Sequence, residues 1–152
     1  MNQVSVDIAR LLESRGYGRI GASSGWCICS DIEPPLPDTC ITVYDVGGPQ
    51  HDHAMVESDS YGRKFPAFQR TDFQIRVRAS NNRIAWLRME KCESIDRYGP
   101  FDVEPDVDAN SGDLGTHYCR IMQTSEPIYM QRDQLQRLVW VVNFRAYRQE
   151  KL

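Results

Sequence analysis

The sequence has few histidines, no long apolar run and no excess of positive charge. Its 152 residues include three histidines, and 18 lysines and arginines stand against 21 aspartates and glutamates, for a formal net charge of −3. Domains that grip nucleic-acid backbones usually carry a dense basic face, so this balance argues against such a role. The first apolar stretch, Val4 to Leu12, contains Asp7 and Arg10 and therefore predicts neither a signal sequence nor a membrane span.

Motifs that mark common enzyme classes are also missing. The chain has no G-x-S-x-G nucleophile elbow, no H-E-x-x-H zinc motif and no Walker loop. Residues 16–21 formally spell a dinucleotide-binding fingerprint, but they follow a predicted helix instead of a strand, so we treat the match as chance. A triad of Ser23, Ser24 or a cysteine with His117 stays open, but nothing singles it out. We therefore expect a protein that is not an enzyme.

Two groups of potential metal ligands fail the usual spacing rules. His51 and His53 lie two residues apart, and the Cys-x-Cys gap of Cys27 and Cys29, which could complete a site, is tighter than the usual zinc spacing. The stretch that begins at Asp106 imitates a calcium loop only in part, because glycine stands at its seventh position and histidine at its twelfth. We therefore expect no metal ion and no other cofactor.

The cysteines are five in number and scattered along the chain. Three of them fall in apolar stretches that predict strands or helices, which suits buried free thiols better than a disulfide framework. We therefore expect synthesis in the cytoplasm with reduced thiols. The five are Cys27, Cys29, Cys40, Cys92 and Cys119.

Hydrophobic periodicity predicts two helices and several strands. The helices are expected over 3–15 and about 82–98, and the strands over 26–29, 40–46, 71–79, 117–124 and 135–147. Ser80 or Asn81 can cap the second helix, and Arg76 and Arg78 are expected on a wet face of the strand 71–79. This order of elements predicts an α+β fold, a largely antiparallel sheet of about four to five strands with two helices packed on one face.

The length of the chain suits a single domain over residues 1–152, with long loops near 47–70 and 100–115. Arg63, Lys64 and Arg70 lie close together in the first loop and are candidates for pairing with an acidic neighbouring subunit. Trp86 is expected on the side of the second helix away from its apolar face (Ile84, Leu87, Met89, Cys92, Ile95 and Tyr98), where a tryptophan can anchor an interface. The acidic candidates of the second loop are Asp102, Glu104, Asp106, Asp108 and Asp113.

One block of residues carries a family resemblance. Pro37 to Gly48 reads Pro-Asp-Thr-Cys-Ile-Thr-Val-Tyr-Asp-Val-Gly-Gly, and it follows a helix with Ile8 to Leu12 and a proline-rich segment. The alternating strand Phe73 to Arg78 and its helix come next. Together these blocks cover most of residues 4–98, and they resemble the phage "minor capsid" group, which is similar to the tail terminators of long-tailed bacteriophages.

The resemblance implies an α+β virion protein of the tail or neck, without catalysis or cofactor. Such subunits form a ring, often a hexamer, that ends tail-tube growth and joins the tube protein to the head-connector or neck proteins. DNA would pass through the ring without specific binding, and an acidic loop facing the lumen would repel it. No membrane is involved. The alternatives are another head-completion or neck protein and, from a different class, a small metal-dependent hydrolase or nuclease using His51, His53 and the acidic loop.

Overall fold

The computed structural model describes residues 3–47, 50–51, 57–58, 64–65, 69–97, 99–104 and 115–150. In chain order the elements are α1 (Val4–Ser14), β1 (Arg19–Ile20), β2 (Cys27–Ser30), β3 (Cys40–Asp45), β4 (Gln50–His51), β5 (Glu57–Ser58), β6 (Lys64–Phe65), β7 (Gln69–Ala79), α2 (Asn82–Glu93), the 3-10 helix η2 (Ser94–Arg97), β8 (Phe101–Val103), β9 (Thr116–Gln123), β10 (Ile128–Met130) and β11 (Leu138–Glu150). Among these helices, none has the length and apolar character needed to cross a membrane.

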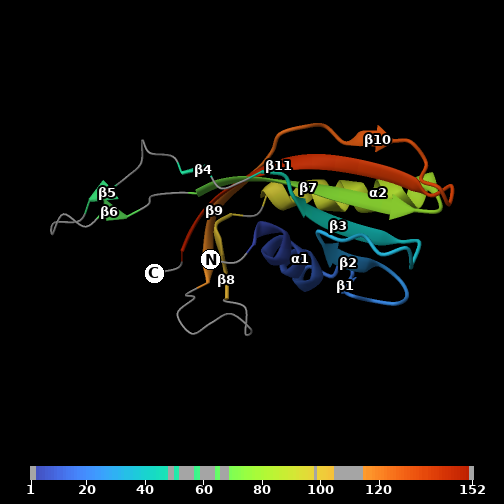
Figure 1. The fold of residues 1–152 in the computed structure, drawn as a ribbon, viewed down its shortest axis with the longest axis horizontal. Helices are drawn as coiled ribbons and strands as arrows, with labels where there is room; N and C mark the ends of the chain where they lie inside the picture. Colours follow the sequence, from blue (N-terminus) through green and yellow to red (C-terminus); the bar gives the residue numbers. More distant parts are fainter. Residues whose placement is uncertain are drawn as a thin grey trace.

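The predicted α+β layout with four to five strands is wrong. The described chain is mostly a curled mixed sheet with two short α-helices, and its strands follow the order β1-β2-β3-β7-β11-β9-β8 (Figure 1). Beside this path, β10 pairs with β11 and β4 with β7. The pairs β1–β2 and β2–β3 are parallel, and the others are antiparallel.

The missed strands are short. β1 and β4 have two residues each, and β8 and β10 have three. An alternation of apolar and polar residues needs at least four positions to be recognised, so such strands leave no periodic signal. The stretches expected as loops at 47–70 and 100–115 accordingly contain β4, β5, β6 and β8 where they are described.

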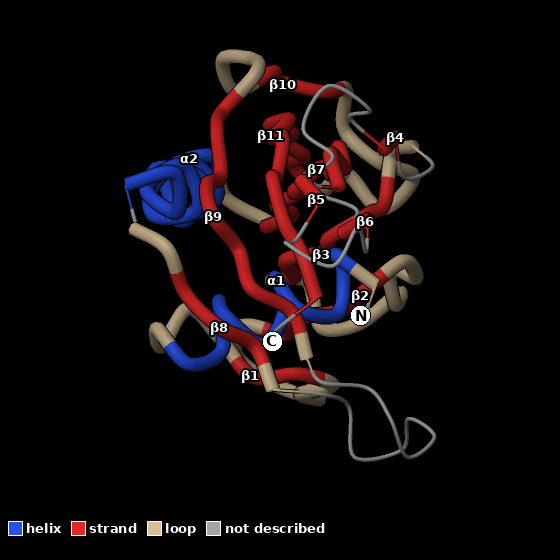
Figure 2. Tube along the Cα trace, turned by 90° about the vertical axis from the view of Figure 1, so that its left-hand side faces the viewer, coloured by secondary structure: helices blue, strands red, loops and turns tan. Residues whose placement is uncertain are grey.

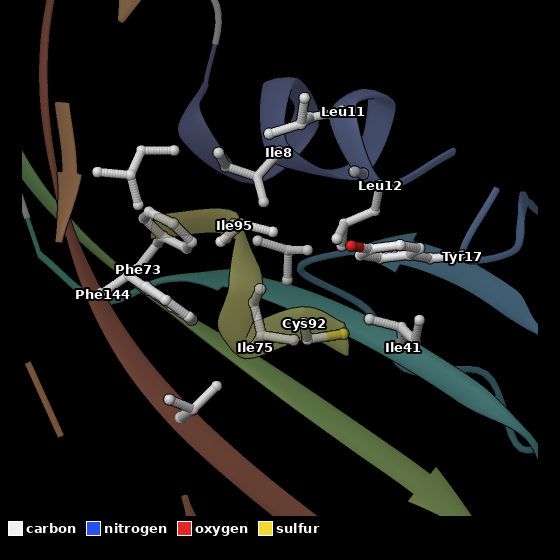
Figure 3. Packing of buried hydrophobic residues seen from close by; sticks show 14 of the residues in the cluster. Ile8, Leu11, Leu12, Tyr17, Ile41, Phe73, Ile75, Cys92, Ile95 and Phe144 are labelled. Atoms are coloured by element: carbon white, nitrogen blue, oxygen red, sulfur yellow. The ribbon is translucent and has the colours of Figure 1, made fainter. Parts of the chain in front are cut away.

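The two longest strands form the centre of the sheet. β7 and β11 pair without interruption from Leu138 opposite Ala79 to Arg148 opposite Gln69. Phe73 and Phe144 face each other in this register, and their rings stack with centroids 5.2 Å apart. The strands curl around α1 (Figure 2), and the core on their inner face combines apolar residues of the sheet, α1, α2 and η2 (Figure 3).

The first helix agrees with its prediction, within one residue at each end. The helix ends at Ser14, and the turn after it contains Gly16, whose φ of +78° is a left-handed conformation that glycine adopts without strain. The N–H groups of Gly16 and Tyr17 donate to the carbonyls of Glu13 and Leu12, at 2.9 and 3.0 Å. This turn directs the chain toward β1 at the edge of the sheet.

The second helix buries a narrower stripe than the sequence predicts. Asn81 caps it, as one of the two expected residues, because its Oδ1 accepts from the N–H of Arg83 at 2.8 Å. Ala85, Met89 and Cys92 are buried, one residue in every three or four, and Ile95 continues the stripe in η2. Ile84 and Leu87 were expected on this face but are 45% and 49% exposed. They flank the buried stripe.

The outer face of β7 is covered at Arg78, contrary to expectation, whereas Arg76 on the same face is partly exposed. The side chain of Arg78 is only 2% exposed, because the proline-rich segment 33–38 lies over it. Its Nη2 donates to the carbonyl of Pro37 at 2.7 Å, and its Nη1 lies 3.5 Å from Oε2 of Glu33. Arg137 also reaches this segment and donates to the carbonyl of Pro35. Hydrogen bonds from Arg78 and Arg137 to backbone carbonyls therefore hold the segment 33–38 against the sheet.

Candidate interaction surface

Trp86 belongs to a group of three aromatic side chains from three different elements. Its ring meets that of Trp140 on β11 edge to face, with centroids 4.9 Å apart at 62°. The ring of Tyr129 on β10 lies 5.3 Å from that of Trp140. We call Trp86, Tyr129 and Trp140 the aromatic surface.

The positions of these rings follow from the strand pairing. Tyr129 is the direct partner of Trp140 in the antiparallel β10–β11 pair, so both side chains stand on the same face of the sheet. The indole Nε1 of Trp140 donates to Oδ1 of Asn82 at 3.2 Å, which ties it to the first turn of α2. Trp86 stands one helical turn further along α2 and closes the group from the helix side.

Much of this area is open to solvent. Trp86 is 36% exposed and Tyr129 46% exposed, and Ile128 and Met130, whose side chains point to the opposite face of β10, are 46% and 44% exposed. Leu135, in the turn between β10 and β11, is 62% exposed. Exposed apolar side chains therefore lie on both faces of β10, and tryptophan and tyrosine are enriched at the anchors of interfaces.

β10 also offers backbone groups. It pairs with β11 on one side, and no other described strand pairs with it. An unpaired edge with apolar side chains is a template on which another chain can add a strand. The arrangement can therefore combine backbone hydrogen bonds with burial of aromatic rings.

A shallow groove lies on the other flank of α2. Trp26, Ile84 and Leu87 supply its apolar wall. The guanidinium of Arg88 covers the Trp26 ring at 4.5 Å and donates to the carbonyl of Tyr17 at 3.0 Å. These contacts fix the loop before β2 to the helix.

Arg70 is the one basic candidate of this group whose side chain is described, and it does not join the aromatic surface. Arg70 is half-buried in β7, seven positions from Val77, which is the partner of Trp140. Seven strand residues span about 23 Å. Lys64 lies in β6, and Arg63 lies outside the described residues.

Two of the acidic candidates are described, and they lie at the end of β8. The carboxylate of Asp102 lies 2.5 Å from Nδ1 of His117 on β9, and Glu104 is exposed. Asp106, Asp108 and Asp113 lie outside the described residues, as does His53. The expectation that His51 and His53 hold no metal ion is therefore not tested, and it stays a prediction.

Sequence reasoning missed Tyr129 and Trp140 as members of the surface. Trp140 lies within the predicted strand 135–147, and its side chain is partly buried at the margin of the core. The signal for β10 was the short apolar run Ile128 to Met130, between two turn-rich stretches. Three residues are too few to identify a strand by periodicity.

Comparison with known proteins adds no family to these observations. No protein-family model matches the chain, and no curated protein matches it. The aromatic surface and the edge of β10 are therefore the features that a proposed function has to explain.

Proposed function

We propose that this chain is a structural, non-enzymatic subunit of a ring at the head-proximal end of a phage tail. There it ends growth of the tail tube and joins the tail to the head connector. The aromatic surface beside the unpaired edge of β10 carries the proposal, because this combination suits contact between subunits. The resemblance of the block Pro37 to Gly48 to tail terminators supports the phage setting and the hexameric ring.

The occupant of the aromatic surface is a second copy of this chain. A closed ring is built from heterologous contacts, in which one surface of a subunit meets a different surface of the next. β1 lies at the opposite end of the strand order and carries Ile20, 48% exposed. Ile32, 78% exposed, follows the neighbouring strand β2. The β10 side of one subunit would meet this β1 side of its neighbour.

The lumen of the ring is proposed to be acidic. Asp102 and Glu104 lie at the end of β8 and begin the acidic stretch that continues to Asp113. Negative side chains would keep the duplex from binding as it passes, since tight contacts to phosphates would hold it in place.

The test compares single charged substitutions on the two sides. Tyr129→Lys places a charge on the β10 edge and Ile20→Lys places one on the β1 edge, whereas Val46→Lys changes an exposed residue (55%) outside both sides. Light scattering after size exclusion, and electron microscopy with purified tails, should show rings for the parent and Val46→Lys. Neither edge variant alone should form rings.

The mixture of the two edge variants distinguishes a head-to-tail contact from a symmetric one. Each variant keeps one intact side, so together they should form heterodimers that cannot close. A parent chain that stays monomeric when concentrated and also fails to bind tail tubes would rule the proposal out. Circular dichroism of each variant checks that the fold is kept.

A further inference from the structure

Three cysteine thiols converge on the outer face of the sheet. Cys27 and Cys29 are two residues apart on β2, so their side chains point to the same face. The parallel pairing of β2 and β3 places Cys40 directly beside Cys27. The Sγ atoms of Cys27 and Cys29 lie 3.3 Å apart, and all three Sγ atoms lie within 4.8 Å of one another.

These distances fit the coordination of one ion. Zinc–sulfur bonds of about 2.3 Å place neighbouring thiolates about 3.8–4.0 Å apart around the metal. The observed spacing brackets that value, so small rotations about the Cα–Cβ bonds would bring the three sulfurs onto one centre. The thiols are free, and they are the one group of three or more potential metal ligands found among the described residues.

The surroundings balance the charge of such a site. Zn²⁺ with three thiolates carries one net negative charge. Arg78, the buried partner of Cys40 in the β3–β7 pair, and Arg76 both lie within 3.5 Å of Oε2 of Glu33, so these three side chains together leave one positive charge beside the site. The hydroxyl of Thr42 lies 3.5 Å from Sγ of Cys40 and can donate to a thiolate. Second-shell donors of this kind orient metal ligands.

Access differs among the three ligands. Cys27 and Cys40 are buried at 2% and 0% exposure, whereas Cys29 is half-buried and leaves a way in from solvent. Burial raises the pKa of Cys40 and raises that of Cys29 to about 12, so both thiols are protonated without a metal.

We propose that Cys27, Cys29 and Cys40 bind one thiophilic cation of the Zn²⁺ type through three thiolates, with a fourth position open to solvent on the Cys29 side. Three metal–sulfur bonds form, and three protons leave to the buffer. The ion would link β2 to β3 at the end of the sheet that carries the parallel pairs. The proposal is independent of the ring function.

The test is titration of the full chain, reduced and stripped of metal, with Co²⁺ and then with Zn²⁺. Tetrahedral cobalt bound to thiolates gives sulfur-to-cobalt charge-transfer absorption, so one equivalent should saturate that band and Zn²⁺ should displace it. Cys29→Ser should weaken binding by more than about tenfold, since losing even an outer-shell partner typically costs ten- to a hundredfold. Cys119→Ser is the matched control, because Cys119 is half-buried on β9 and outside the group.

Alkylation read by mass spectrometry gives a second measurement on the parent chain. Zn²⁺ should protect Cys29, the half-buried thiol of the three, and leave the equally half-buried Cys119 unchanged. Absence of the charge-transfer band at saturating Co²⁺ overturns the proposal, whatever the folding of the variants. So does unchanged affinity in a folded Cys29→Ser variant, which would locate the ion elsewhere on the surface.

Discussion

The phenolic hydroxyl of Tyr118 on β9 donates a 2.8 Å hydrogen bond to Oδ2 of Asp7 on α1, and neither side chain has any exposed surface. The bond joins residues 111 positions apart in sequence and fixes the first helix against the curled sheet. It also makes the protein sensitive to alkaline pH. Burial, and then the negative charge of Asp7, raise the pKa of Tyr118 well above its usual range.

Tyr118→Phe should lower the free energy of unfolding at neutral pH by about 1–3 kcal/mol, because a buried acceptor loses a donor. The raised pKa means that the stability contributed by Tyr118 is complete below the unfolded pKa of about 10 and is lost as pH rises above it. Denaturant titrations from pH 7 to 11 should therefore show a shallower alkaline loss in the variant. Equal slopes in both proteins would contradict this assignment.

Asp72 on β7 and Arg145 on β11 form an ion pair with two hydrogen bonds. Arg145 donates from Nε to Oδ1 at 2.8 Å and from Nη2 to Oδ2 at 3.1 Å. These bonds lower the pKa of Asp72, so its contribution is complete above the unfolded pKa of about 3.9 and is lost as pH falls below it. Asp72→Asn should flatten the acid side of the stability profile. The exchanged pair Asp72→Arg with Arg145→Asp should restore part of the slope.

Asp45 caps the first helix from a neighbouring strand. Its Oδ1 accepts from the N–H of Ser5 at 3.1 Å, whereas the N-cap residue Gln3 makes no side-chain cap. Asp45→Ala should therefore cost about 0.5–2 kcal/mol, the usual range for a lost cap. Asp45→Asn keeps an oxygen acceptor and should cost less, as measured by thermal and denaturant unfolding. Equal losses in both variants would point to the charge instead of the hydrogen bond.

A substitution at Trp86 should affect the assembly of subunits more than the stability of the single subunit. Trp86→Ala removes the edge-to-face contact with Trp140, worth about 1 kcal/mol beyond the buried area. The subunit should still fold, with a modest fall in melting temperature. It should no longer make the contact between subunits that builds the proposed ring. Calorimetry and light scattering on the same samples check both effects. Ring formation by a folded Trp86→Ala protein would remove Trp86 from the interface.

The parts of the fold that were predictable are those with a long periodic signal. The α1 helix has its apolar stripe and a terminal glycine, and β7 alternates over many positions. The cap at Asn81 also follows a local rule, whereas β11 begins and ends three residues later than predicted. These features depend on residues close in sequence, so the sequence contains what is needed to identify them.

The remainder depends on contacts between distant residues. Nothing local to Arg78 indicates that the segment 33–38 lies over it. The grouping of Cys27, Cys29 and Cys40 requires the parallel pairing of β2 and β3, which the spacing of the cysteines does not encode. The exposure of Ile84 and Leu87 depends on which side of α2 faces the sheet, and the buried side is the one that carries Ala85.

The segment 33–38, whose carbonyls accept hydrogen bonds from Arg78 and Arg137, limits how further subunits could be added. Prolines at three of its six positions have no N–H to donate, so the segment offers little for a further strand to pair with. It covers the outer face of the sheet at Arg78 and Arg137, while the helices cover the inner face. In the proposed ring, subunits would therefore meet through the edges of the sheet and not through this covered part of its face. Extension along edges alone gives a layer one molecule thick.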